Sequence, residues 1–112
     1  MRTPEQLAQA QLDAYNAKDL DAFVACYSKD VRVWRWPQPE PTLVGLQAFA
    51  DAYRSNVFSK PAIQAQITQR IVMGNKVVDH ERVSGKGPDP VEVIAVYDCA
   101  DGAIHSVVFF SP

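Results

Sequence analysis

The spacing of apolar residues changes near residue 60, and this change limits the folds open to the chain. Before it, apolar residues recur every three or four positions, as in the run from Leu46 to Val57, which is the spacing of one helix face. After it, apolar and polar residues alternate in four segments, as in half-buried strands: 62–73, 76–85, 91–99 and 103–110. Helices followed by strands predict an α+β domain, in which helices cover one face of an antiparallel sheet.

The N-terminal part also contains signals for two earlier helices and a strand. The segment 3–19 begins with a capping box, in which the Thr3 hydroxyl can accept the amide of the glutamine three residues later. Asp19 is placed to cap a second, short helix over 20–27. An expected strand over 31–37 ends at a proline, and a proline-rich crossing leads from it to the third helix.

The composition fits one globular domain over residues 1–112. Hydrophobic residues make up 47% of the chain and charged residues 21%, and the net charge is −2 without a basic run. Nucleic acid is not expected as a partner, because phosphate binding needs clustered Lys and Arg. No apolar stretch approaches the ~20 residues that span a bilayer, and the first residues do not resemble a signal peptide.

The two cysteines, Cys26 and Cys99, lie far apart and match no zinc or redox spacing. We expect both to be small buried residues in a reducing cytoplasm. No element carries His, Cys and carboxylates at metal-ligand spacing, and no glycine-rich phosphate loop is present. The sequence therefore predicts neither a metal site nor a cofactor.

Four consecutive polar residues interrupt the valines of segment 76–85: Asp79, His80, Glu81 and Arg82. A two-residue Gly-Asn turn before this segment places Arg70 opposite Asp79, as a cross-strand ion pair. One face of that hairpin is mostly apolar, and burying it turns His80 and Arg82 toward the helices and Asp79 and Glu81 toward water. A register slip of one residue would invert this assignment.

An imidazole and a guanidinium beneath the helices would be chemically useful. His80 is then the best general base, since its unperturbed pKa is ~6.5. Arg82 would need a partner, water or a ligand, and it could hold a carboxylate or enolate oxygen. The alternative is structural, with Arg82 paired to an acid at the cavity rim and His80 bonded to a backbone carbonyl.

The last two strands are joined around an Asp-Gly turn and are apolar on both faces. One helical layer covers only one face, so the other needs a different partner. We expect a homodimer through the sheet face that carries Val93, Ala95, Tyr97, Val108 and Phe110.

Three segments carry a resemblance to a known group: 12–34, 79–85 and 96–110. Their sequences, LDAYNAKDLDAFVACYSKDVRVW, DHERVSG and VYDCADGAIHSVVFF, resemble the SnoaL-like and ketosteroid-isomerase-like group of the nuclear-transport-factor-two-like superfamily. The resemblance implies a curved sheet wrapped around the N-terminal helices as a cone with an internal cavity, often in dimers. It does not fix a function, because the superfamily contains enzymes and non-enzymes.

Two enzymes of the superfamily show which chemistry to test. The three catalytic positions of ketosteroid isomerase fall here on Arg35 or Trp36, on Gln11, and near Ile94 or Val96, none of which carries the required aspartate or tyrosine. The resemblance to limonene epoxide hydrolase makes Arg82 its arginine. Its two aspartates are replaced by Ser84 and by a residue near Phe109, and an arginine alone does not activate water. For the His/Asp pair of SnoaL-type cyclases, His80 is the candidate imidazole.

Two readings of the function remain open. One is an enzyme with isomerase, cyclase or hydrolase chemistry on a small apolar, cyclic metabolite, in which His80 moves a proton and Arg82 steadies charge. The other is a non-catalytic ligand-binding or dimerisation module. If the protein is an enzyme, six residues are expected to line the cavity; the alternative is that they are ordinary core residues. They are Trp34, Trp36, Phe49, Tyr53, Val96 and Phe109. Arg35 faces away if its two Trp neighbours face in.

Overall fold

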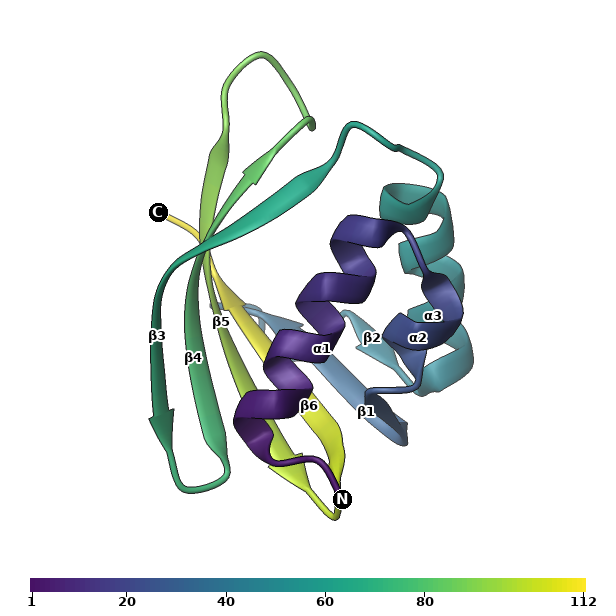
Figure 1. The fold of residues 1–112 in the computed structure, drawn as a ribbon, viewed down its shortest axis with the longest axis vertical. Helices are drawn as coiled ribbons and strands as arrows, with labels where there is room; N and C mark the ends of the chain where they lie inside the picture. The colour runs from purple at the N-terminus through teal and green to yellow at the C-terminus, as the bar shows by residue number, and fades with distance from the viewer.

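A computed structural model describes residues 1–112 and shows helices packed on one side of a curved sheet (Figure 1). The elements, in chain order, are α1 (Pro4–Ala17), α2 (Leu20–Val24), β1 (Tyr27–Arg35), β2 (Leu43–Val44), α3 (Leu46–Tyr53), a π-helical continuation η1 (Arg54–Phe58), β3 (Gln64–Met73), β4 (Lys76–Ser84), β5 (Val91–Ala100) and β6 (Ala103–Phe110). The α+β class expected from the change in period is confirmed. None of the helices is long and apolar enough to cross a bilayer.

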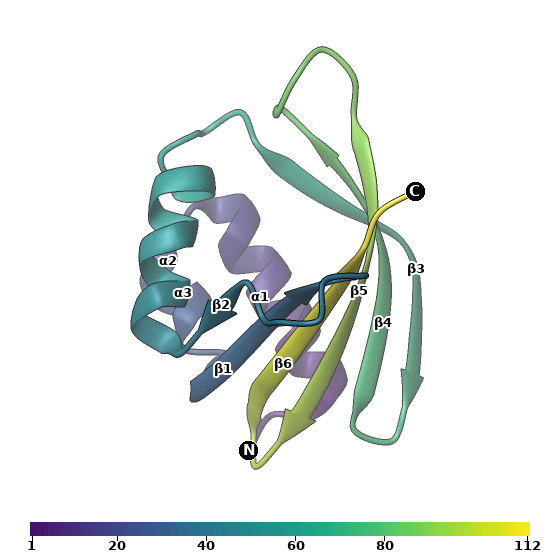
Figure 2. The same cartoon turned by 180° about the vertical axis from the view of Figure 1, so that it is seen from behind.

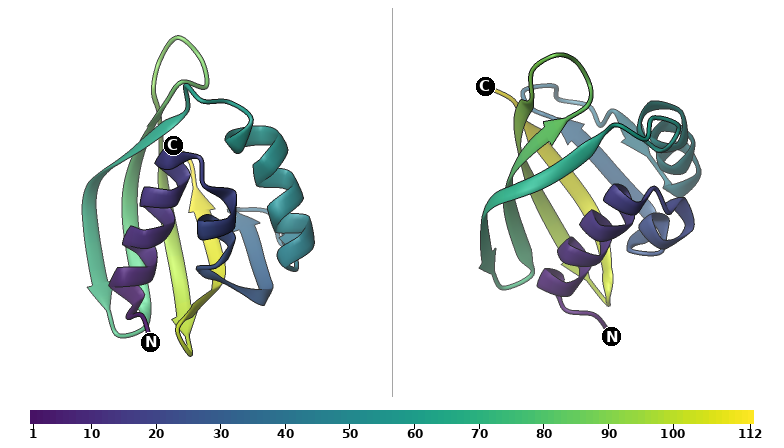
Figure 3. Two further views of the ribbon diagram at one scale, coloured as in Figure 1. Left: turned by 45° about the vertical axis from the view of Figure 1, so that its right-hand side comes forward. Right: turned by 45° about the horizontal axis from the view of Figure 1, so that its top comes forward.

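The six strands form one sheet in the order β2-β1-β6-β5-β4-β3. All neighbours are antiparallel except β1 and β6, which run parallel (Figure 2). A purely antiparallel sheet was expected, but β1 and β6 belong to opposite ends of the chain and need no hairpin between them. The sheet curves around α1, which lies along its concave side with α3 beside it (Figure 3).

The helix ends follow local sequence signals. Thr3 accepts the Gln6 amide at 3.2 Å and the Gln6 side chain accepts the Thr3 amide at 2.9 Å, so the expected capping box is confirmed. Helix α1 ends at Lys18, which has a left-handed backbone with φ 60°. Asp19 then accepts the Ala22 amide at 3.1 Å and caps α2, as expected.

An aromatic cluster joins α2, α3 and β1. The rings of Phe23 and Phe49 stack at 5.6 Å and are both fully buried, and Tyr27 lies 4.4 Å from Phe49. Removing such a ring typically costs 3–5 kcal/mol. Cys26 and Cys99 are also buried, as expected, with free thiols. This core closes one part of the space between helices and sheet.

The hairpin of β3 and β4 corrects a central expectation. Near the turn, Arg70 lies opposite Asp79 as predicted, but a bulge between Ile67 and Gln69 places Ile67 opposite Glu81. On β4 the buried positions are Val77, Asp79, Glu81 and Val83, so the prediction that His80 and Arg82 face the helices is wrong.

The bulge is also the physical reason for that error. It splits the apolar residues of β3 between two faces: Ala65 is buried, whereas Ile71 and Met73 are exposed on the opposite side. The apolar face inferred for the whole strand therefore does not exist. The two buried valines of β4 decide its orientation, and they share a face with the acids.

The last hairpin shows the same kind of shift. A bulge between Asp98 and Cys99 brings Tyr97 opposite Val107 and Ala95 opposite Phe109. Ala95 and Tyr97 are buried under the helices, and Val93 lies on their face of the strand. The predicted dimer face therefore mixed two sides of the sheet, and only Val108 and Phe110 of that set lie on the outer side.

Candidate active site

A cavity of about 300 Å³ lies between the helices and the concave face of the sheet. Twelve of its 18 lining residues are hydrophobic. The cavity lies next to a small second core cluster, formed by Val57, Ile63, Ala65 and Val83. Its volume is at the lower end of the range for small-molecule sites. The other six lining residues are Gln11, Arg35, Glu81, Lys86, Glu92 and Ser111, and four of the twelve hydrophobic residues are tyrosines: Tyr15, Tyr27, Tyr53 and Tyr97.

Glu81 is the buried acid of this cavity, with only 9% of its surface exposed. The Tyr97 hydroxyl donates to Glu81 Oε2 at 3.2 Å, and Gln11 Nε2 donates to the Tyr97 hydroxyl at 3.2 Å. The Tyr27 hydroxyl donates in turn to Gln11 Oε1 at 3.0 Å. Four residues from four elements thus form one chain of hydrogen bonds that points toward the carboxyl group.

The pKa of Glu81 is raised to about 7, mainly by burial and also by the negative charge of Asp79. The hydrogen bond from Tyr97 and the charges of Lys86 and Arg70 act in the opposite direction. A carboxyl group with this pKa is present in both protonation states near neutral pH. It can therefore accept a proton and also return one.

Asp79 lies on the same face of β4 and is fully buried. It accepts hydrogen bonds from Arg70 Nε at 2.7 Å and from Arg70 Nη2 at 3.0 Å, which confirms the ion pair expected from the hairpin register. The pair is buried, because the side chain of Arg70 is only 15% exposed. Gln9 Oε1 accepts Arg70 Nη1 at 2.9 Å and holds the guanidinium from α1. A fixed negative charge therefore stands beside Glu81.

Four tyrosines line the cavity, and burial keeps their hydroxyls protonated. Burial raises the pKa of Tyr15 to about 12, and it also raises the pKa values of Tyr27, Tyr53 and Tyr97. Tyr27 and Tyr97 donate within the hydrogen-bond chain described above. The hydroxyls of Tyr15 and Tyr53 make no hydrogen bond with another residue of the protein and are available to a ligand.

Two cationic side chains also line the cavity. Arg35 is the last residue of β1, and its guanidinium carbon lies 4.9 Å from the centre of the Phe109 ring. Lys86 lies in the loop between β4 and β5. Burial lowers the pKa of Lys86, and the positive charge of Arg35 lowers it further.

Gly85 determines the course of the backbone just before Lys86. Its φ is 90°, and a Cβ at this position would lie 2.0 Å from the carbonyl oxygen of Ala62. Only glycine fits such a close approach of two backbones. The loop that carries Lys86 is therefore anchored at its start.

The model of the SnoaL-like domain family matches residues 8–107 of the chain. The chain belongs to the SnoaL-like family. No curated protein sequence matches this SnoaL-like protein significantly.

Solved structures with the same fold have low sequence identity to it. A candidate ketosteroid isomerase from Kribbella flavida has a TM-score of 0.86 and 18% identity, over 97% of this chain and 77% of the other. A candidate polyketide cyclase from Sinorhizobium meliloti has a TM-score of 0.76 and 23% identity, over 92% of each chain. A computationally designed 17-OHP binder has a TM-score of 0.85 and 13% identity, over 100% of this chain and 93% of the other. At these identities the likeness establishes the cone fold expected from the sequence.

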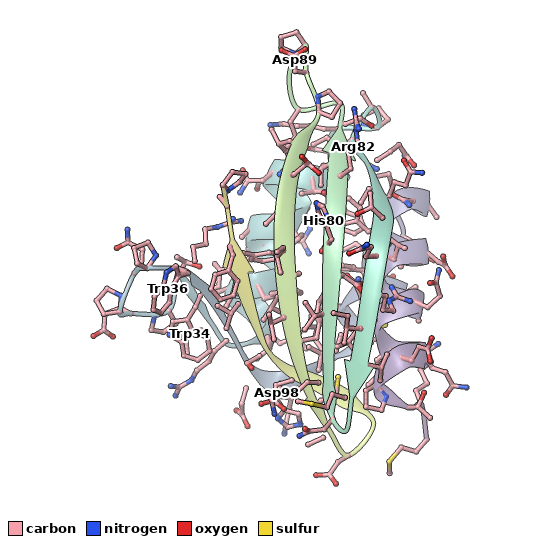
Figure 4. All side chains as sticks on the ribbon, turned by 90° about the vertical axis from the view of Figure 1, so that its left-hand side faces the viewer. Trp34, Trp36, His80, Arg82, Asp89 and Asp98 are labelled. Carbon is pink, nitrogen blue, oxygen red and sulfur yellow. The ribbon has the colours of Figure 1, made fainter.

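The structure places His80 and Arg82 of the SnoaL-like protein on the outer side of the sheet. Both side chains project from β4 away from the helices (Figure 4). His80 Nε2 lies 2.8 Å from Glu92 Oε1, and Arg82 is exposed. Neither residue lines the cavity. The geometric reason for giving them proton transfer and charge stabilisation is therefore lost.

The expected lining residues are divided between three places. Tyr53 and Phe109 line the cavity, and Phe49 is fully buried in the neighbouring aromatic cluster. Three residues lie on the outer side of the sheet: Trp34, Trp36 and Val96. Arg35 therefore faces the cavity and its two Trp neighbours face away, which is the reverse of the lining that was predicted.

The sequence reasoning missed Glu81, Tyr97 and Lys86. A signal for Glu81 was present, because Val77 and Val83 flank the polar residues of β4 and share its alternation. Burial of those valines would have turned both acids inward. No comparable local signal marks Lys86, which reaches the cavity from a loop.

Proposed function

We propose that this SnoaL-like protein binds a small, largely apolar, cyclic molecule in its cavity and that Glu81 moves a proton on it. The observation that carries the proposal is a buried carboxyl group with a pKa of about 7 in a cavity lined mainly by hydrophobic residues. General bases and acids work best when their pKa lies near the working pH. Perturbed titratable groups in a cavity are candidates for catalysis.

The proposed step needs no cofactor. The ionised carboxylate of Glu81 takes a proton from a carbon beside a carbonyl group. The electron pair of the broken C–H bond forms a C=C bond, and the π electrons of the carbonyl move to its oxygen to give an enolate. The protonated Glu81 then returns the proton to the same carbon or to another one, as in an isomerisation. The free hydroxyls of Tyr15 and Tyr53 are candidates to donate to the developing oxyanion.

The comparisons support a small-molecule ligand of this kind. Structures of the same fold include proteins described as a candidate ketosteroid isomerase, a candidate polyketide cyclase and a computationally designed 17-OHP binder. The proposal therefore keeps the acid–base chemistry expected from the sequence but assigns it to Glu81, with Tyr97 and Gln11 as positioning residues.

Exchange of the α-hydrogens of 2-tetralone in D2O provides the test. This ketone has two rings, and NMR follows the replacement of its α-hydrogens by deuterium near neutral pH. We expect the wild-type protein to accelerate the exchange and Glu81→Gln to lose at least about 100-fold of that acceleration, as is typical of a general base. Glu40→Gln, which removes an exposed carboxylate outside the cavity, should exchange like the wild type.

The second reading, a ligand-binding module, gives a different result in the same experiment. In that case 2-tetralone perturbs NMR signals of cavity residues, but its exchange rate equals that in buffer. Such a result would remove the proton transfer and leave the binding.

We further propose that two copies of the protein pair through the outer side of the sheet. That side carries Trp36, Ile94 and Ile71 at 67%, 41% and 62% exposure, with Val108 and Phe110 between them. Large exposed apolar patches mark interaction surfaces.

We also propose that the protein lies in the cytoplasm, where its two buried thiols stay reduced.

A further inference from the structure

Two cations line the cavity without an acidic partner of their own. The ion pairs of the chain involve neither Arg35 nor Lys86. Arg35 is held against the face of Phe109, so its guanidinium stays beside the hydrophobic wall. Both are exposed residues that also line the cavity, so water solvates their charges and they are available to an anion that enters.

The acids near these cations do not neutralise them. Glu92 lines the cavity, but its Oε1 is within hydrogen-bond distance of His80 Nε2, at 2.8 Å. Glu81 is the other acid of the lining, and its raised pKa of about 7 leaves much of it uncharged near neutral pH. Burial and the charge of Arg35 lower the pKa of Lys86 by more than the charge of Glu81 raises it.

We propose that the ligand of this cavity is an apolar acid. Its carboxylate is bound by Arg35 and Lys86, and its apolar body lies against the aromatic side chains that line the cavity. This inference rests on the proposed function, because it names the class of molecule that fills the same cavity. A guanidinium binds a carboxylate through two parallel hydrogen bonds, and Lys86 adds a second charge. Glu81 lines the same cavity as these two cations.

The cavity volume limits the size of this acid. Its 300 Å³ equals about ten water molecules at ~30 Å³ each, which is room for one or two rings or a short chain.

Two compounds of the same shape test the inference, 2-naphthoate and its neutral analogue 2-naphthamide. Titration calorimetry at pH 6 keeps the carboxylate ionised and most of Glu81 protonated. We expect the wild-type protein to bind the acid at least about tenfold more tightly than the amide, since hydrogen bonds between charged groups are the strong ones. Arg35→Gln and Lys86→Gln should each reduce this preference and leave the affinity for the amide unchanged.

Arg32→Gln is the matched control, because Arg32 lies on the same strand, is exposed and does not line the cavity. It makes the same change in net charge and should keep the preference for the acid. Equal affinities of the wild-type protein for the two compounds would overturn the inference but not the proposed function. An equal loss of preference in Arg32→Gln would also overturn it. Failure of both compounds to bind would contradict the proposed cavity function as well.

Discussion

Glu81 concentrates the chemistry of this protein in one residue. It is a carboxyl group that folding has moved out of water, next to the buried charge of Asp79. Its hydrogen bond from Tyr97 favours the ionised form but does not offset the cost of burial. The environment that raises the pKa of Glu81 toward neutral pH therefore also makes its ionised form destabilise the folded protein.

Glu81→Gln should make the stability of the protein less dependent on pH. The pKa of Glu81 is raised from 4.5 to about 7 in the folded protein, so the folded state holds the proton more strongly than the unfolded chain. Its contribution to the free energy of unfolding is fully present below about pH 4.5 and is lost as the pH rises through 7. The loss is on the order of 3 kcal/mol, at 1.36 kcal/mol for each pKa unit.

The variant cannot ionise at this position and should be more stable than the wild type at pH 8. The two proteins should approach equal stability near pH 4.5. Urea unfolding at both pH values measures the difference. A difference that stays constant between the two pH values would show that Glu81 titrates normally in the folded state.

At the scale of elements, β4 organises the site because one of its faces carries a polar residue pair between two valines. The bulge in β3 lets Arg70 reach Asp79 while Ala65 stays in the second core cluster. The hairpin thus combines a buried ion pair at one level with hydrophobic packing at the next. Removing one partner of the ion pair would leave a buried charge unpaired.

Asp79→Asn should destabilise the protein strongly. Arg70 would lose both charged hydrogen bonds at a site that is nearly closed to water, and the expected cost is about 3–5 kcal/mol. Asp98→Asn is the matched control, because the Lys76–Asp98 pair is 42% exposed on both sides and should contribute 0–1 kcal/mol. Urea unfolding at pH 7 compares the two variants, and equal losses would mean that burial of the Arg70–Asp79 pair has no energetic effect.

At the scale of the whole molecule, the curved sheet has two differently used sides. Its concave side, the helices and the β4–β5 loop enclose the cavity. Its outer side has apolar residues on several strands and is covered by no element of the chain (Figures 1 and 4). The two sides belong to the same strands, so an interface on one side would also stiffen the wall of the cavity on the other.

Ile94→Lys should weaken the proposed dimer. Ile94 is 41% exposed near the middle of the outer side, where it lies opposite Phe110. A lysine there would place a charge in an apolar interface, whereas Val44→Lys changes an exposed apolar residue, at 54% exposure, on the short edge strand β2. Sedimentation equilibrium should give a dimer of the 12.4 kDa chain for the wild type and Val44→Lys, and a monomer for Ile94→Lys. A wild-type protein that is monomeric at every concentration would exclude the interface.

The sequence by itself determined the parts of this protein that depend on neighbouring residues. The capping box at Thr3, the Asp19 cap, the change of period near residue 60 and the turn that pairs Arg70 with Asp79 are all local signals, and the structure contains each of them. The family resemblance added the cone and its cavity, and the comparisons confirm that fold.

Only the tertiary structure decided which side of each strand faces the cavity. Alternation has a period of two, so it says which residues share a face but not which face is buried. A bulge of one residue exchanges the faces on either side of it, and nothing in the local sequence marked the bulges in β3 or between Asp98 and Cys99. The inward position of Glu81 instead of His80, and of Arg35 instead of Trp34, follows from packing across the sheet, which involves residues far apart in the chain.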